Sequence, residues 1–328
     1  SDDPYLFRTF VRAVLPATAA AHAHLGTELR YVSDCRAIAA DAADLPPPFE
    51  VEPGQPSRGV NAAGLAFTCA LAPEREGGPE GARPVSFAEL SRCMMADCST
   101  VADAVDLLLG AECVAPAFSV LLADDAGDLA QVEVGLFGCA VHAQHSKGNP
   151  GVVVAVNCHQ WTGLVSANKP EAQLSCEENN NGCRLRRGWE LAELHRGVLD
   201  AEALAAVLAD HGNRERECSG NPLIKFWGHS ICNHGSRRSS KYAALEPPWG
   251  TVSAEILEPS RRALQYCYGW PCGECAEFAD QLFQSNSWGR FRAFSLPHGP
   301  AADAAAAAEL GAGVVECTGI DGSLRDEG

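Results

Sequence analysis

The sequence has no apolar run as long as the ~18 residues that a membrane-spanning helix needs. It also has few basic residues, because 25 lysines and arginines stand against 42 aspartates and glutamates, for a formal net charge of −17. A phosphate backbone or an anionic lipid surface requires a basic face, so we expect neither a nucleic acid nor a membrane among the partners. The first apolar segment is interrupted by charges and has no basic start, which is not the pattern of a secretory signal.

The cysteines lack the paired spacing that a zinc ribbon requires. The chain has 15 of them, an odd number, and several lie inside apolar runs, as Cys69, Cys139 and Cys267 do. Cys272 and Cys275 form a CxxC motif without a second pair at matching spacing, so we expect no metal site. Buried thiols in a reducing compartment explain this usage best, and the sequence therefore predicts a cytoplasmic protein.

The composition is that of a globular protein, with 46% hydrophobic and 20% charged residues. Strand-like runs joined by turn residues predict hairpins, and amphipathic segments predict helices that come in pairs. The hairpins are expected over 118–134 and 251–268, and the helix pairs over 86–109 and 184–211. Two largely antiparallel sheets, each covered by a helix pair, predict an α+β fold with four layers, an αββα sandwich.

Three regions are expected along the chain. Apolar residues at helical spacing over 5–15 predict an N-terminal helical segment within residues 1–24. Residues 25–285 are expected to form the αββα domain, and residues 286–328 a C-terminal extension. Within the domain, a helix is predicted from just after the CxxC motif to about residue 283.

Two stretches place polar side chains where a site would be well supported. At 59–67 a turn led by Asn61 feeds into an apolar strand, so its amide and the backbone N–H groups could hold an oxyanion. The alternative is a plain Asn/Gly turn. The continuous apolar run 152–156 predicts a strand buried on both faces, and Asn157 and His159 follow it directly. Here the alternative is a strand end at which the asparagine caps a loop.

The order of these motifs resembles a known family. The motifs are VNAAGLA at 60–66, LLADDAG at 121–127 with Glu133, VNCH at 156–159, the helix pair from Arg184, ICNH at 231–234, TVS at 251–253 and GWPC at 269–272. Each motif is weak alone. Together they resemble the acyl-coenzyme A:isopenicillin N acyltransferase family, also called the C45 peptidase family, of the N-terminal-nucleophile (Ntn) hydrolases. The resemblance covers roughly residues 25–285 and implies an Ntn-hydrolase-like sandwich.

The resemblance also implies a mechanism. An internal nucleophile becomes an N-terminus by autoproteolysis and attacks a small-molecule amide, a peptide or an acyl thioester, with its own α-amine as base. No cofactor is needed. Asn61 and Asn157 fall where the family supplies groups that hold the oxyanion or orient the amine. Arg184 or Arg187 falls near a substrate-facing arginine, and His159 is expected to contact the substrate.

The nucleophile is expected at Cys35, the only cysteine upstream of Asn61. Cleavage after Asp34 would expose it and would extend the propeptide to residue 34. The family usually continues with an Arg-Asn-x-Asp run, of which this chain keeps only the last residue, Asp44. If Asp44 is the family aspartate, the nucleophile falls near Thr27, which is the alternative. Cys35 is favoured because a thiolate attacks a carbonyl more readily than a hydroxyl near neutral pH.

Three functions from different classes remain open. The first is an amidohydrolase or N-acyltransferase that uses this nucleophile. The second is a catalytically inactive relative that binds an acyl or peptide ligand, motivated by the altered Arg-Asn-x-Asp run. The third is an unrelated metal or redox protein, motivated by Cys272 and Cys275.

Overall fold

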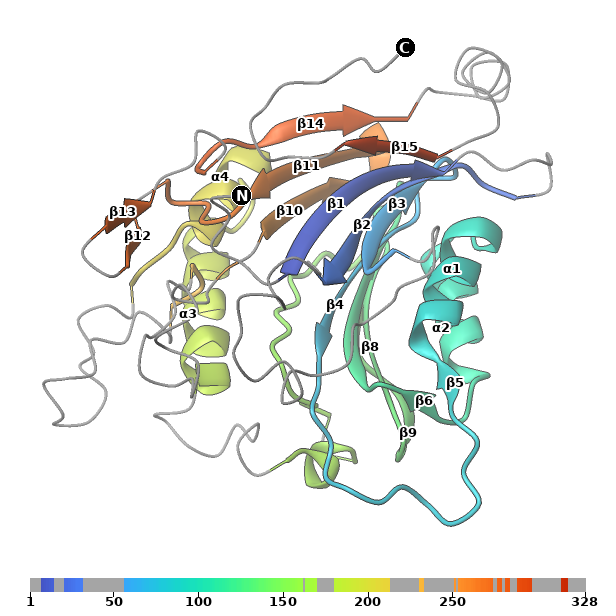
Figure 1. Cartoon of the computed structure of the whole chain (residues 1–328). Coiled ribbons are helices and arrows are strands. Elements are labelled where there is room, and N and C mark those ends of the chain that lie inside the picture. Colours follow the sequence, from blue (N-terminus) through green and yellow to red (C-terminus); the bar gives the residue numbers. More distant parts are fainter. Residues whose placement is uncertain are drawn as a thin grey trace, which may run out of the picture.

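The computed structural model describes residues 7–14, 21–31, 56–161, 163–169, 180–212, 230–232, 251, 253–273, 276–278, 281–283, 288–296 and 314–317. In this part of the chain the helices and strands form four layers (Figure 1). One helix pair covers a large sheet, a smaller sheet packs on the other face of the large one, and a second helix pair lies beyond it. The αββα order predicted from the sequence is confirmed, and the fold is α+β.

The large sheet has eight strands in the order β15-β1-β2-β3-β4-β7-β8-β9, and every neighbouring pair is antiparallel. Its strands are β1 (Phe7–Val14), β2 (His24–Tyr31), β3 (Arg58–Asn61), β4 (Ala66–Leu71), β7 (Phe118–Ala123), β8 (Leu129–Gly135), β9 (Gly138–His145) and β15 (Val314–Cys317). The predicted hairpin of β7 and β8 is confirmed. Its turn is closed by a hydrogen bond from the Asp124 N–H to the Asp128 carbonyl, and Gly127 supplies the positive φ of 91° that the turn needs.

Helices α1 (Phe87–Asp97) and α2 (Val101–Leu109) pack on one face of this sheet, as predicted. Helix α2 begins with a capping box at Thr100. The side chain of Thr100 accepts the backbone N–H of Asp103, and the side chain of Asp103 accepts the backbone N–H of Thr100. The two-residue strands β5 (Val85–Ser86) and β6 (Val114–Ala115) flank the pair. The core between helices and sheet consists of buried apolar side chains, among them Leu65, Phe67, Met94, Leu108, Leu122 and Val132.

The second sheet consists of β10 (Ser253–Glu258), β11 (Ala263–Tyr268) and β14 (Arg292–Ser295), all antiparallel. The hairpin predicted over 251–268 is confirmed, and a 3-10 turn at Pro259–Arg261 joins its strands. A second core fills the space between the two sheets, with Val60, Ala66, Leu264, Tyr266 and Trp270 among its buried members. The outer helices are α3 (Asn180–Leu194) and α4 (Ala201–Leu208), of which α4 contacts β10. No helix of the described residues has the length and hydropathy to cross a membrane.

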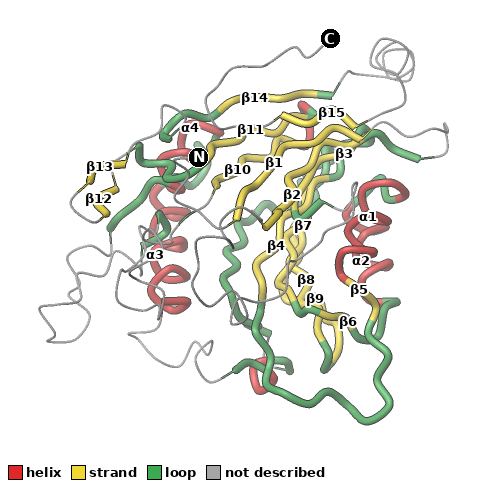
Figure 2. Tube along the Cα trace, viewed as in Figure 1, coloured by secondary structure: helices red, strands yellow, loops and turns green. Residues whose placement is uncertain are grey.

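The N-terminal helix predicted over 5–15 is wrong, because Phe7–Val14 forms strand β1 (Figure 2). The apolar residues there satisfy helical spacing, but β1 pairs along its whole length with β2, from Phe7 opposite Tyr31 to Val14 opposite His24. Backbone pairing with a ready partner strand outweighs a weak local preference. The large sheet thus includes β1 and β15, both of which lie outside residues 25–285.

Two further predictions of secondary structure are also wrong. Among the described residues the run 152–156 pairs with no strand, and only Val156 of it is buried. Val156 packs against Leu185 of α3 instead. The helix predicted after the CxxC motif is replaced by the short antiparallel strands β12 (Ala276–Phe278) and β13 (Gln281–Phe283). Both errors concern short segments, in which the pattern of apolar residues alone does not distinguish a strand from a helix.

Candidate functional site

Asn157 and Arg184, both predicted from the family motifs, lie in contact. The Nη2 of Arg184 donates to the Oδ1 of Asn157 at 2.9 Å and to the Oδ1 of Asn181 at 2.8 Å. Asn181 in turn donates from Nδ2 to the backbone carbonyl of Asn157 at 2.9 Å. Asn157 donates to the Leu71 carbonyl at the end of β4, at 3.0 Å. The cluster of Asn157, Asn181 and Arg184 therefore joins the large sheet to the first turn of α3.

Close packing between α3 and the extended segment before Asn157 fixes this cluster. Val156 and Cys158 are buried and pack against Leu185 of the helix. At Gly188 a Cβ would lie 2.7 Å from the Cγ1 of Val154, so only glycine allows the segment to approach the helix this closely. The cluster is thus held from both sides, which is the support that a binding or catalytic site requires.

Burial sets the charge states around the cluster. Burial lowers the pKa of Arg184, which the nearby Cys158 raises in part, yet a guanidinium stays protonated in proteins. Burial also raises the pKa of Cys158 to about 12, with a further contribution from the negative charge of Glu133. Cys158 is therefore a neutral thiol near neutral pH and is unsuited to act as a nucleophile. The cluster offers a cation and amide groups, which together can hold a carboxylate or a carbonyl oxygen.

His159, predicted to contact the substrate, is fully buried between two carboxylates. Its Nε2 lies 3.0 Å from an oxygen of Glu74, and its Nδ1 lies 3.5 Å from an oxygen of Glu133. Asn168 holds the backbone of His159 on both sides, accepting from its N–H at 2.8 Å and donating to its carbonyl at 2.9 Å. In this conformation the ring has no exposed edge to offer a substrate, so the geometry gives His159 a positioning role for the loop at 157–161.

The carboxylates around His159 change its proton affinity. Burial alone lowers the pKa of His159, but hydrogen bonds and charges of Glu133 and Glu74 outweigh it and raise the pKa to about 9. Glu133 also accepts the N–H groups of Gln160 at 2.5 Å and of Trp161 at 3.0 Å. An imidazolium flanked by two buried carboxylates thus ties the loop to β8 and to the segment around Glu74.

Asn61, predicted to hold an oxyanion, has its amide fully engaged with the backbone. Its Nδ2 donates to the carbonyls of Met95 at 3.1 Å and Cys98 at 2.8 Å, and its Oδ1 accepts the N–H of Leu65 at 3.0 Å. Both amide protons are used, so none remains for an oxyanion in this conformation. Asn61 instead ties the end of α1 to the turn between β3 and β4.

The candidate nucleophiles are placed differently. Cys35 and Asp44 lie outside the described residues. Thr27 lies within β2, paired with Val11 on one side and Arg58 on the other. Its side chain is fully buried, and its Oγ1 has no hydrogen-bond partner among the residues that the structure describes. Cleavage before Thr27 would cut β2 in the middle, so the structure does not favour Thr27 as an N-terminal residue.

From the sequence, Glu133 was named only as part of a motif, and Gln131 and Glu74 were missed. Glu133 and Gln131 alternate with buried apolar residues along β8, and buried polar residues in that pattern were a usable signal for a polar network. Glu74 carried no such signal, because its surroundings are rich in Gly, Pro and Glu and are typical of a surface loop. It is positioned by a bridge to Asn168 and by the absence of a side chain at Gly135, where a Cβ would overlap its carboxylate.

The region around Asn157, Arg184 and His159 contains amides, a guanidinium and an ion-paired histidine. In the described part of the chain, one group of three metal-ligating side chains lies close together, and it lies outside this region, at His211, Cys232 and Cys272.

Residues 50–180 match the family model described as acyl-coenzyme A:6-aminopenicillanic acid acyl-transferase. The match confirms the family resemblance of the ordered motifs in this part of the chain. It includes Asn61, Glu133, Asn157 and His159, whereas Arg184 lies just beyond it. No curated protein matches the sequence.

Solved structures give distant matches. An arginine-to-leucine variant of conjugated bile acid hydrolase from Clostridium perfringens has 11% sequence identity and a TM-score of 0.45, over 99% of this chain and 94% of that chain. Penicillin V acylase from Agrobacterium tumefaciens has 14% identity and a TM-score of 0.38, over 79% of this chain and 74% of that chain. Sequence identities and TM-scores this low carry no argument about the activity of this chain.

Proposed function

We propose that the protein is an amide hydrolase or acyltransferase, because residues 50–180 match the family model described as acyl-coenzyme A:6-aminopenicillanic acid acyl-transferase. Its substrate is a small-molecule amide, a peptide or an acyl thioester, and the acyl group passes to water or to an amine. The observation that carries this proposal is the family match, which spans the Asn61 turn, the hairpin of β7 and β8, and the loop of Asn157.

Cys35 is the proposed nucleophile, exposed by cleavage after Asp34. The α-amine of Cys35 takes the thiol proton, the sulfur attacks the carbonyl carbon, the bond to the leaving amine or thiol breaks, and the α-ammonium returns the proton to the leaving group. Water or an amine then attacks the enzyme thioester, releases the acyl group and restores the thiol. The burial of Thr27 inside β2 supports Cys35 over the alternative.

Asn157 and Arg184 are the proposed substrate-facing groups. Among the described residues, one Nδ2 proton of Asn157 goes to Leu71, which leaves the second proton for a developing oxyanion or for the α-amine. The two Nη2 contacts of Arg184 are with uncharged amide oxygens. This cation and the amide of Asn157 are proposed to face a carboxylate or carbonyl oxygen of the substrate.

The cleavage step is tested by intact mass and N-terminal sequencing of the purified full chain. We expect a break between residues 34 and 35 that is absent from Cys35→Ala and present in Thr27→Ala. A panel of chromogenic acyl amides and acyl thioesters then tests turnover. An unbroken chain that turns over substrate would refute Cys35 as the nucleophile. An unbroken and inactive chain would favour the inactive relative that binds an acyl or peptide ligand.

The role of Asn157 is tested by Asn157→Ala, with Asn149→Ala as the matched control on an exposed turn. Loss of an oxyanion donor typically lowers the turnover rate by about 10² or more, so we expect that loss in Asn157→Ala and none in the control. Circular dichroism establishes that both variants are folded. Near-normal turnover of folded Asn157→Ala would remove this residue from the site.

A further inference from the structure

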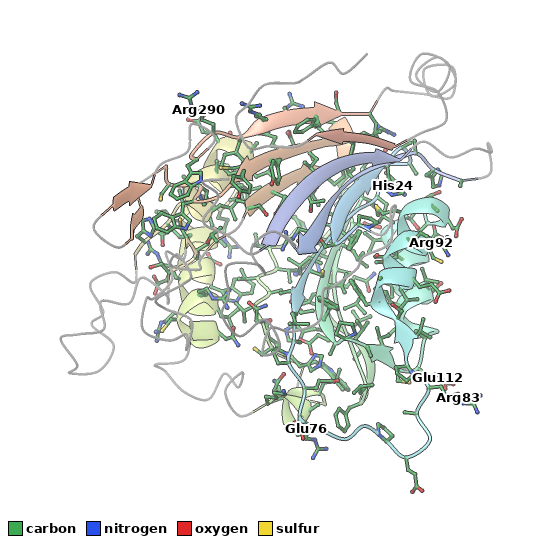
Figure 3. The ribbon with its side chains drawn as sticks, in the orientation of Figure 1. His24, Glu76, Arg83, Arg92, Glu112 and Arg290 are labelled. Atoms are coloured by element: carbon green, nitrogen blue, oxygen red, sulfur yellow. The ribbon has the colours of Figure 1, made fainter. Side chains whose placement is uncertain are left out.

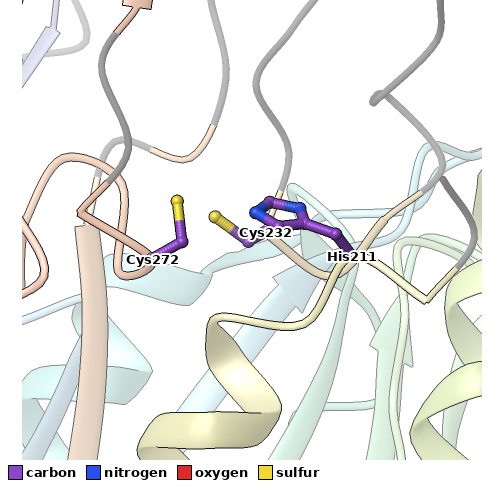
Figure 4. Close-up of side chains that lie close together, drawn as sticks. All are labelled: His211, Cys232 and Cys272. Carbon is purple, nitrogen blue, oxygen red and sulfur yellow. The ribbon is translucent and has the colours of Figure 1, made fainter.

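His211, Cys232 and Cys272 come from three separate segments and meet at one place (Figure 4). One ligand atom from each, the imidazole nitrogen and the two Sγ atoms, lies within 4.8 Å of the other two. Cys232 is fully buried, and the other two are half-buried. In Figure 4 the Sγ of Cys232 lies between the imidazole and the Sγ of Cys272. Two thiols and an imidazole are the groups that bind zinc in proteins.

The backbone on the His211 side is fixed by its neighbour Asp210. The carboxylate of Asp210 accepts two hydrogen bonds from Arg187 of α3, each at 2.8 Å, and its Oδ1 also accepts the N–H of Gly212 at 2.9 Å. The carbonyl of Asp210 accepts the N–H of Cys232 at 3.2 Å. The segments that carry His211 and Cys232 are therefore already joined to each other and to α3.

The backbone on the Cys272 side is a tight turn at the exit of β11. The carbonyl of Trp270 accepts the N–H groups of Gly273 and Gly289, each at 3.0 Å. Gly273 and Gly289 both have positive φ, and a Cβ at Gly289 would lie 2.9 Å from the Cα of Gly273. The rings of Trp270 and Trp288 pack against each other at a tilt of 38°, with their centroids 4.9 Å apart. This packing leaves little freedom to the backbone that presents Cys272.

We propose that His211, Cys232 and Cys272 bind a Zn²⁺ ion. A tetrahedral zinc with bonds of about 2.3 Å to sulfur and about 2.0 Å to nitrogen separates its ligand atoms by roughly 3.5–3.8 Å. In the structure the three ligand atoms lie within 4.8 Å of one another. The side chains therefore need to move only about 1 Å to meet that geometry. Soft thiolates with an imidazole favour zinc over the hard cations Mg²⁺ and Ca²⁺, which take oxygen ligands.

Charge also favours zinc at this place. Binding releases one proton from each thiol, and two thiolates with one Zn²⁺ and a neutral imidazole make a site without net charge. A neutral site avoids the large cost of leaving thiolates uncompensated in a buried position. The ion ties the end of α4 to Cys232 and to the turn after β11, and its fourth position is taken by water or by a further ligand. This site is independent of the proposed acyl-transfer activity.

Zinc content tests the proposal directly. Protein purified without chelators should carry about one zinc per chain by elemental analysis. Loss of an outer-shell partner alone costs a metal site 10–100-fold in affinity, so His211→Gln, Cys232→Ser and Cys272→Ser should each lose at least about 100-fold in competition with a chromophoric chelator. Cys113→Ser and His195→Gln, which remove the same side-chain types elsewhere, should bind as the wild type does.

Cobalt titration of the wild-type protein supplies a readout that does not depend on the variants folding. Co²⁺ bound by two thiolates and an imidazole gives visible d–d bands of a tetrahedral site and an ultraviolet sulfur-to-cobalt band, both displaced by Zn²⁺. Added zinc should also raise the unfolding temperature, and a chelator should lower it. Zinc far below one per chain with no cobalt bands, or a disulfide between Cys232 and Cys272 in protein purified without oxygen, would overturn the proposal.

Discussion

The buried ion triad of Glu74, His159 and Glu133 should make the protein less stable in alkaline solution. In the folded protein the pKa of His159 is raised from 6.5 to about 9. The folded chain thus keeps a proton that the unfolded chain has lost. The stabilisation is fully present below pH 6.5 and disappears as the pH rises through about 9. Each tenfold change in proton affinity is worth about 1.4 kcal/mol, so the whole effect is roughly 3 kcal/mol.

The assay is urea unfolding, followed by circular dichroism, between pH 6.5 and pH 9 for the wild type and His159→Gln. Buried thiols with raised pKa values, such as Cys69 and Cys158 at about 12, also release protons on unfolding in alkali. The measured quantity is therefore the difference between wild type and variant. We expect the wild type to lose roughly 3 kcal/mol more of its unfolding free energy than His159→Gln does.

The control is His142→Gln, which removes an exposed histidine of β9 and should keep the wild-type slope. At pH 6.5 His159→Gln should be less stable than the wild type, because Glu74 and Glu133 then face each other without a cation. Glu74→Gln in the His159→Gln background should restore part of that loss. Equal slopes of unfolding free energy against pH in the wild type and in folded His159→Gln would refute this reasoning.

Two further predictions concern buried polar side chains. His24 (labelled in Figure 3) is buried on β2, and burial lowers its pKa to about 4. The free energy of unfolding should therefore decrease as the pH drops from 6.5 towards 4. In unfolding measurements it should decrease less for His24→Leu than for the wild type, and an equal decrease would contradict the prediction. Asn61→Ala should cost roughly 3 kcal/mol, because it leaves backbone groups of Met95, Cys98 and Leu65 unpaired. A change in thermal unfolding below about 1 kcal/mol would contradict it.

Local signals were sufficient for elements that carry their own turn. The hairpin around Gly127 could be predicted because its turn residues are neighbours in the sequence. Strand β1 could not, because its apolar residues fit a helix and a strand equally well. Its pairing with β2 decides the outcome, and that pairing is a property of the folded chain.

In the candidate site, too, some features could be predicted from the sequence and others depend on the folded structure. The family motifs led to Asn157 and Arg184, which the structure brings into contact at 2.9 Å. Predicting a substrate contact for His159 and an oxyanion role for Asn61 required knowing which way each side chain points, and the sequence does not contain that information. The His211, Cys232 and Cys272 cluster was missed because zinc was sought as paired ligands at short spacing, whereas these ligands are far apart in the sequence.

Strand β15 adds the last strand of the large sheet next to β1, with Val314 opposite Val14 and Cys317 opposite Val11. During synthesis the strands from β1 to β9 of this sheet emerge before the rest of the chain and can pair in order. The backbone N–H and C=O groups along the outer edge of β1 stay open until β15 has been made. Closing the sheet is therefore a long-range and slow step of folding. Until it is complete, β1 is the edge at which two nascent chains would pair with each other and aggregate.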